Sequence, residues 1–148
     1  PSKRGDVFRQ AALKALDTLS RNPDGFFLMI EGSNIDKAAH SNNLEEMMEE
    51  LLDFDRTAGA VLDWASKHPG TLVVITADHN TGAFALTGGS REKGEITARF
   101  GSGSHDGVAV PVYAFGAGSG AFTGIYENTA IFSKIMDAFK KGAGKPVR

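Results

Sequence analysis

The sequence predicts an α/β fold in which a layered sheet of mainly parallel strands is flanked by helices. Short apolar runs at 26–30, 71–77 and 108–115 are typical of buried strands. Segments with apolar residues at helical spacing alternate with these runs, as expected when helices connect parallel strands. The 148 residues are enough for one hydrophobic core, so we expect a single domain over 1–148 with a frayed tail at 142–148.

Composition places the chain among ordinary folded proteins. Apolar residues make up 41% and charged residues 23%, and the formal net charge is -2. This balance gives no electrostatic basis for binding nucleic acid or an anionic membrane, so neither is an expected partner. The apolar runs are far too short to span a bilayer. The chain has no cysteine, which excludes disulfides, and it contains no signal peptide. It begins without an initiator Met and is therefore expected to be a piece of a longer protein.

The first part of the chain predicts a helix, a strand and a short helical turn. Apolar residues at helical spacing over 6–19, with Asp6 as the N-cap, predict the first helix. A turn at 22–25 precedes the strand at 26–30, because Asn, Pro and Gly together break regular structure. About one helical turn is expected within the polar stretch 34–43.

A long helix is predicted from Leu44 to Lys67, with Asn43 and Glu46 as its capping pair. Asp55 falls on the apolar stripe of this helix, where a bare carboxylate requires a partner. The stripe comprises Leu44, Met47, Met48, Leu51, Leu52, Ala58, Leu62 and Ala65.

The second half predicts a strand, a loop-rich stretch, another strand and a final helix. The strand at 71–77 is followed by glycine-rich loops around a short extended piece at 83–86. The strand at 108–115 comes next, and apolar residues at helical spacing over 128–141 predict the terminal helix.

Acidic and imidazole side chains follow the first predicted strand. Glu31 lies at its end, and Asp36 and His40 are four residues apart, which places them on one side of a helical turn. A carboxylate and an imidazole in this arrangement can bind one zinc ion. A hard oxygen ligand such as Glu31 suits magnesium better. Because ligands collect beyond the carboxyl ends of parallel strands, all three residues are candidate metal ligands.

A second group follows the next strand. Asp78 and His79 are adjacent, so both can reach one metal only if the strand has already ended. His105 lies in a glycine- and serine-rich loop that can bring its imidazole back towards the strand ends. Each feature alone is typical of a cap, a surface pair or a solvated loop, so the metal-site interpretation depends on their convergence. His68 is interpreted as a solvent-exposed residue at a helix end, and Asp106 either joins the site or only shapes its turn.

Four segments resemble the alkaline phosphatase family, in the family's order along the chain. The run 26–36, Phe-Phe-Leu-Met-Ile-Glu-Gly-Ser-Asn-Ile-Asp, resembles the segment around the family's magnesium and zinc ligands. The run 71–79, which ends in Thr-Ala-Asp-His, and the run 54–59 resemble further family signatures, and 104–110 is a looser match. The resemblance extends over about residues 6–139 and implies the C-terminal part of the alkaline phosphatase fold.

The resemblance also implies a centre with two zinc ions and one magnesium ion. Lys37 sits where some relatives place a lysine near the phosphate. The residues that match the family's metal ligands are Glu31 for magnesium, Asp36, His40 and His105 for the first zinc, and Asp78 and His79 for the second zinc.

Several parts of the family's active site have no match in this chain. They are the serine nucleophile, the phosphate-binding arginine, an aspartate shared by the second zinc and magnesium, and the remaining magnesium ligands. The resemblance therefore implies a parent enzyme that hydrolyses phosphate monoesters through a phosphoserine intermediate, and a fragment that is inactive alone. The missing N-terminal half of the same enzyme and a second copy of the chain are expected partners. The family implies a periplasmic or extracellular location.

Two alternatives stay open at this point. One is another hydrolase of the wider superfamily, such as a phosphodiesterase, a sulfatase or a metal-dependent mutase, which the nucleophile upstream of this chain would distinguish. The other is a non-catalytic metal-binding module, which zinc binding without any turnover would favour.

Overall fold

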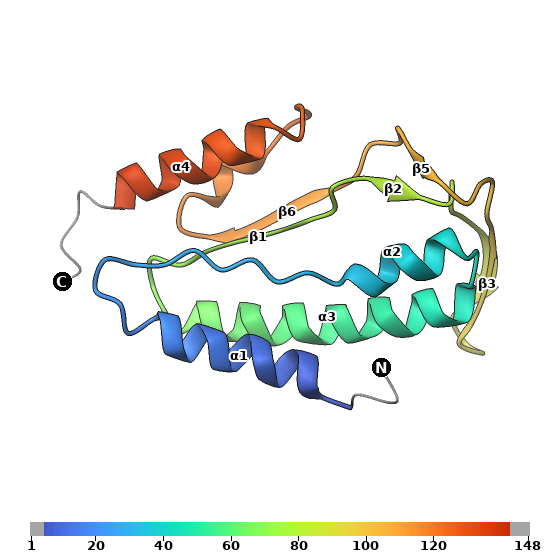
Figure 1. The fold of residues 1–148 in the computed structure, drawn as a ribbon, viewed down its shortest axis with the longest axis horizontal. Coiled ribbons are helices and arrows are strands. Elements are labelled where there is room, and N and C mark those ends of the chain that lie inside the picture. The colour runs from blue at the N-terminus through green and yellow to red at the C-terminus, as the bar shows by residue number, and fades with distance from the viewer. Residues whose placement is uncertain (1–4, 143–148) are drawn as a thin grey trace.

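The computed structural model describes residues 5–142. Within that range, α1 and α3 lie side by side on one side of the β1–β6 pair, and α4 lies on the other side (Figure 1). Of the predicted tail, Gly142 ends α4 and residues 143–148 lie outside the described residues. The elements, in chain order, are α1 (Val7–Leu19), α2 (Ser33–His40), α3 (Leu44–Ser66), β1 (Leu72–Thr76), β2 (Asn80–Thr81), β3 (Ala85–Ser90), β4 (Glu95–Arg99), β5 (His105–Asp106), β6 (Val112–Gly116), the 3₁₀-helix η1 (Ser119–Phe122) and α4 (Ala130–Gly142).

The predicted helices are confirmed, and a side-chain cap explains where α3 begins. Asn43 caps α3: its side-chain oxygen accepts a hydrogen bond from the Glu46 backbone N–H at 3.2 Å, and its amide donates to the Glu46 carboxylate at 3.1 Å. Asp6 lies at the N-cap position of α1, but its carboxylate binds the Arg9 guanidinium at 2.6 Å instead of a helix N–H. This contact holds the pKa of Asp6 below its usual value. No helix within residues 5–142 combines the length and apolar character that crossing a bilayer requires.

The buried face of α3 differs from the predicted stripe. Leu51 and Leu52 are 42% and 50% exposed, whereas Glu50, Asp53 and Thr57 are buried. Helices α1 and α2 both pack on α3, and their positions decide which side chains lose contact with water. The Thr57 hydroxyl donates to the backbone carbonyl of Asp53 at 2.9 Å, which satisfies one polar group of the buried face. A hydropathy stripe shows which side chains favour burial but not where neighbouring helices lie, and this is why it also misplaced the exposed Asp55.

The predicted layered sheet of mainly parallel strands is wrong. The strands of residues 5–142 form three separate two-stranded antiparallel ladders. In one of them, β1 pairs with β6 from Leu72 opposite Gly116 to Thr76 opposite Val112. An apolar run predicts burial on both faces, but it does not encode the direction of the neighbouring strand. The mixed α/β character remains, without the parallel layer.

The segment 26–30 is extended but is not a hydrogen-bonded strand, in contrast to the prediction. Its backbone forms no hydrogen bond with another backbone group in the described part of the chain. Its side chains alternate in exposure: Phe27 and Met29 are 62% and 73% exposed, and Phe26, Leu28 and Ile30 are half-buried. The inward Phe26 ring meets Trp64 of α3 edge-on, with ring centroids 6.4 Å apart. Alternation of this kind is the pattern of a strand that has one covered face.

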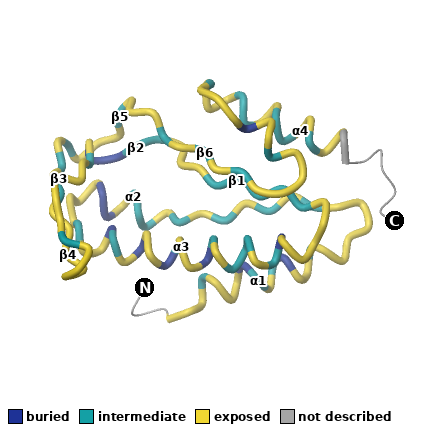
Figure 2. The backbone as a smooth tube through the Cα atoms, turned by 180° about the vertical axis from the view of Figure 1, so that it is seen from behind, coloured by how far each residue is buried: buried dark blue, intermediate teal, exposed yellow. Residues whose placement is uncertain are grey.

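A small core fixes α2 on α3. Ala38 and Ala39 of α2 and Met47 of α3 are buried together, and Phe84 and Phe100 pack against them. Figure 2 shows that the buried residues concentrate on the helices. The sharp turn after β2 passes close to this core at a glycine with φ 80°. A Cβ at Gly82 would lie 2.9 Å from the ring of Phe100. The close approach brings the end of β2 beside α2.

Candidate metal centre

Helix α2 places two predicted ligands on one face. Asp36 and His40 are four residues apart on this helix, so their side chains project to the same side. Asp36 Oδ2 lies 3.5 Å from His40 Nε2. Ala38 and Ala39, between them in the sequence, are buried against α3. Their burial fixes the rotation of α2 and keeps the ligand-bearing side accessible.

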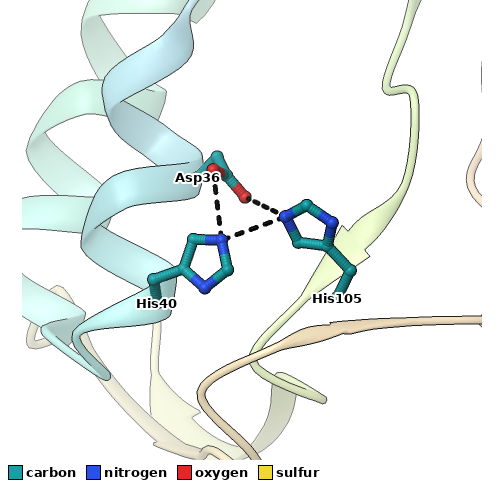
Figure 3. Close-up of side chains that lie close together, drawn as sticks. All are labelled: Asp36, His40 and His105. Atoms are coloured by element: carbon teal, nitrogen blue, oxygen red, sulfur yellow. Dashed lines mark hydrogen bonds and ion pairs between the residues drawn. The ribbon is translucent and has the colours of Figure 1, made fainter.

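Strand β5 brings His105 to the same place from 65 positions beyond His40. It pairs with β2, which puts Thr81 opposite His105. His105 Nε2 lies 3.0 Å from His40 Nε2 and 3.6 Å from Asp36 Oδ1. Figure 3 shows the three side chains converging, and one candidate ligand atom from each lies within 4.8 Å of the others. Asp36, His40 and His105 are called the three-donor group below.

The separations in the three-donor group fit a small divalent cation. Bonds of about 2.0–2.1 Å to a tetrahedral zinc place neighbouring donor atoms about 3.3 Å apart. The two imidazole nitrogens are 3.0 Å apart, and each has a different oxygen of Asp36 nearby, at 3.5 Å (Oδ2) for His40 and 3.6 Å (Oδ1) for His105. The side chains of Asp36, His40 and His105 are 38%, 37% and 51% exposed, so water or a ligand can reach the group. Two imidazoles and one carboxylate are the donors of a zinc site with an open fourth position.

A backbone carbonyl determines which nitrogen of His40 faces this group. His40 Nδ1 lies 2.7 Å from the carbonyl oxygen of Gly103, and this contact requires the ring proton on Nδ1. Nε2 of the neutral ring then presents a lone pair to Asp36 and His105. Metal-binding histidines are commonly oriented in this way by their second nitrogen.

Thr81 belongs to the site, although the sequence analysis missed it. Its hydroxyl donates to Asp36 Oδ1 at 2.6 Å and lies 3.1 Å from His79 Nδ1. Since the single hydroxyl proton goes to Asp36, the hydroxyl oxygen accepts the Nδ1 proton of His79. Thr81 is 8% exposed, which shields both contacts from water. Its place two residues after His79 was a weak signal, because spacing gives no indication of a contact with a residue 45 positions earlier.

Asp78 and His79 form a pair beside the three-donor group. His79 Nε2 lies 3.2 Å from Asp78 Oδ2, and the His79 ring stacks on His105 with centroids 3.5 Å apart. With the His79 proton on Nδ1, Nε2 and the carboxylate both present lone pairs to each other. A proton or a cation between them removes this repulsion. The Asp78 side chain is 85% exposed, so the pair is open to a ligand from outside.

The other predicted residues stand apart from the three-donor group. Glu31 is exposed, and within residues 5–142 it joins no cluster of three candidate ligands. Lys37 donates from Nζ to Asn34 Oδ1 at 3.2 Å. His68 is exposed at the end of α3, as predicted, and its ring stacks on Trp64 with centroids 3.7 Å apart.

Asp106 does more than shape its own turn. Its carboxylate accepts hydrogen bonds from the backbone N–H groups of Val108 and Ala83 and from the side-chain amide of Asn80. The Val108 N–H, followed by the Asn80 amide, holds the pKa of the Asp106 carboxyl below its usual value, because these donors favour the charged form.

The comparisons with protein families and curated proteins agree with the motifs. The sequence model of the family described as alkaline phosphatase matches residues 6–101. Alkaline phosphatase 4 of Bacillus subtilis is 45% identical over 85 residues, which cover 57% of this chain and 18% of that protein. Streptomycin-6-phosphate phosphatase of Streptomyces griseus is 35% identical, over 77% of this chain and 29% of its own length. The alkaline phosphatase of Escherichia coli is 31% identical, over 84% of this chain and 30% of that protein.

Solved structures give the same picture. The alkaline phosphatase from the Antarctic bacterium TAB5 superposes with a TM-score of 0.85 and 40% identity, and the match covers 93% of this chain and 42% of that protein. A variant of the TAB5 protein solved with Mg bound has the same TM-score at 41% identity. The chain therefore spans less than half the length of each of these relatives.

Proposed function

The chain belongs to the alkaline phosphatase family, and we propose that it is the C-terminal, metal-binding part of an enzyme that hydrolyses phosphate monoesters through a phosphoserine intermediate. The three-donor group carries the proposal, because it has the composition and spacing of a catalytic zinc site in a chain whose curated relatives are phosphatases. The activity is proposed for the whole parent protein, which extends beyond this chain. A periplasmic or extracellular location and a homodimer are proposed from the family alone.

In this proposal Asp36, His40 and His105 hold one zinc ion. The bound ion supplies a Lewis acid for phosphate and leaving-group oxygens. The chain's own residues prepare the ligands: the Gly103 carbonyl keeps the His40 proton on Nδ1, and the Thr81 hydroxyl holds Asp36 in place. By fixing the orientation of His40 and Asp36, both contacts favour metal binding. The open side of the group leaves room for a phosphate oxygen.

The remaining predicted residues are assigned to neighbouring sites. Asp78 and His79 are proposed to hold a second zinc, which the facing acceptor atoms of the pair support. Glu31, an exposed oxygen donor, is proposed as a magnesium ligand. Lys37 is proposed to attract the substrate phosphate, because it follows the proposed ligand Asp36 directly on α2. These sites need further ligands from another part of the parent protein.

The upstream part of the parent protein is the proposed partner of the segment 26–30. This segment has the alternating exposure of a strand, yet its backbone has no hydrogen-bonded partner within residues 5–142. In that range β1 is also paired along one edge only, with β6. An extended segment from the upstream part would provide the missing hydrogen bonds and cover Phe27 and Met29. The serine nucleophile and the phosphate-binding arginine are proposed to lie in that part.

Phosphatase activity of the parts tests the enzyme proposal. The 148-residue chain, supplied with zinc and magnesium, is assayed with a chromogenic phosphate monoester, alone and after co-expression with the upstream part of its parent. We expect turnover only from the combination, because the nucleophile lies outside the chain. Turnover by the chain alone at the rate of a complete enzyme would contradict the proposed division of the active site. A metal-loaded combination that hydrolyses a diester or a sulfate but no monoester would point to another member of the superfamily.

Zinc binding tests the three-donor group separately. Equilibrium dialysis of the chain is expected to show at least one bound zinc, which is lost in His40→Ala and in His105→Ala. The matched control is His68→Ala, which removes an exposed imidazole of the same type outside the group. Equal zinc content in wild type and all three variants would contradict the assignment of His40 and His105 as zinc ligands, whatever the result of the activity assay.

A further inference from the structure

The pairing of β2 with β5 brings His105 to the three-donor group, but a pairing of two residues is too short to hold it there alone. Each strand has two residues, with Asn80 opposite Asp106 and Thr81 opposite His105. Even complete two-stranded hairpins are marginally stable in water without further packing. His105 is nevertheless held 3.0 Å from His40, so another interaction must keep β5 in place.

The Asp106 carboxylate joins the chain segments on both sides of this pairing. Its Oδ2 accepts from the Asn80 amide at 2.9 Å and from the Ala83 backbone N–H at 2.9 Å. Its Oδ1 accepts from the Val108 backbone N–H at 3.1 Å and from the same Asn80 amide at 3.1 Å. One side chain thus binds strand β2, the turn after it and the loop after β5.

The backbone at Ala83 shows that this turn is held against its own preference. Ala83 has φ 45°, in the left-handed region that residues with a Cβ seldom adopt. The backbone N–H of Ala83 donates a hydrogen bond to the Asp106 carboxylate. Next to it, the Gly82 N–H donates to the Ser104 carbonyl at 2.9 Å, so the turn is joined to the chain just before His105 as well.

We propose that Asp106 is a positioning residue, which holds β5 against β2 and so sets the position of the His105 imidazole in the three-donor group. Asp106 acts on the proposed ligands through the backbone, because it follows His105 directly. Its partner Asn80 directly precedes Thr81, whose hydroxyl binds Asp36. The consequence for metal affinity rests on the proposed zinc site, whereas the consequence for the His105 ring position does not.

The test is Asp106→Asn, which keeps the shape of the side chain. An amide has one acceptor oxygen, so whichever way it turns, two of the four hydrogen bonds are replaced by contacts between donors. The zinc dissociation constant is measured in the 148-residue chain by competition with a chromophoric chelator. We expect it to rise about 10- to 100-fold, the usual effect of removing a group that orients a metal ligand. Asp63→Asn is the control, because it makes the same charge change at an exposed position on α3.

A second measurement does not depend on metal. In the metal-free protein, nuclear Overhauser contacts between the ring protons of His40 and His105 report the position of β5 directly. We expect these contacts to be lost in Asp106→Asn and in Asn80→Ala while the circular dichroism of the helices is unchanged. Retention of the contacts in Asp106→Asn would overturn the proposal, as would wild-type zinc affinity in that variant. Loss of the helices in both variants would also overturn it, since Asp106 would then stabilise the whole fold rather than one ligand.

The two proposals can fail separately. If the wild-type chain binds no zinc but Asp106→Asn loses the ring contacts, the metal centre is wrong and the positioning role of Asp106 is supported. If zinc binds equally well to wild type and to Asp106→Asn, the metal centre stands and the positioning role is wrong.

Discussion

Replacing Thr81 with valine isolates the contribution of one hydroxyl to the proposed zinc site. Valine keeps the branched shape but removes both the hydrogen bond to Asp36 Oδ1 at 2.6 Å and the acceptor for His79 Nδ1. Without the hydroxyl, the Asp36 carboxylate can adopt other rotamers, and zinc binding then has to order it. The expected result of Thr81→Val is weaker zinc binding without loss of the fold.

The magnitude follows from the chemistry and exposure of the contact. Hydrogen bonds to charged groups contribute about 1.5–3 kcal/mol. The Asp36 side chain is 38% exposed, so water can replace part of the lost interaction, and the lower end of the range applies. A change of about 1.4 kcal/mol corresponds to about tenfold in the dissociation constant. We therefore expect the zinc dissociation constant to rise about tenfold.

Competition with a chromophoric chelator measures this change. Thr18→Val is the control, because the Thr18 hydroxyl, on the exposed surface of α1, donates only to the Lys14 carbonyl. Thr81→Ser restores the hydroxyl and is expected to bind zinc like wild type. The reasoning is refuted if Thr81→Val binds zinc as tightly as wild type, or if Thr18→Val weakens binding to the same extent.

Two further predictions concern stability. Gly116 ends β6 at φ 90°, and an added Cβ would collide with the Thr71 carbonyl oxygen, so Gly116→Ala is expected to lower the free energy of unfolding by about 2–4 kcal/mol in urea titrations. Gly120→Ala, where a Cβ meets open space, should change it by less than about 0.5 kcal/mol, and similar losses in both variants would contradict the steric explanation. Asn43→Ala removes the α3 cap and is expected to cost about 1 kcal/mol. In Asn43→Ser, whose hydroxyl can still accept the Glu46 N–H without placing a second carboxylate beside Glu46, the loss should be smaller, and equal losses would speak against capping.

The helices could be predicted because their signals are local. The Asn43 cap and the apolar spacing of α3 lie within one stretch of chain, and the structure places the helix where they indicate. Strand pairing is not local. The run 26–30 has the composition of a strand, but a strand also needs a hydrogen-bonded neighbour, and this segment has none within residues 5–142. The two-residue strands β2 and β5 are too short to produce any alternating pattern, so they could not be predicted.

The candidate site shows the same difference between local features, which the sequence predicts, and contacts between distant segments, which it does not. The spacing of Asp36 and His40 on one helical turn is enough to place them together. His105 reaches the same turn only because a distant loop folds back towards it. The family resemblance implied this contact, whereas the spacing of the residues alone did not establish it. Thr81 and Asp106 act through contacts between distant segments, with Asp36 and Asn80 respectively, and no periodicity in the sequence encodes such contacts.

The separation of His40 and His105 along the chain also links metal content to folding. A cation held by both imidazoles would cross-link positions 65 residues apart. Closing a loop of that length removes entropy from the unfolded chain equivalent to about 4 kcal/mol by the polymer estimate used for disulfides. In a chain without cysteine, the ion would take the place of a covalent bridge. A chelator would then act as a reducing agent does on a disulfide-bonded domain, lowering the melting temperature.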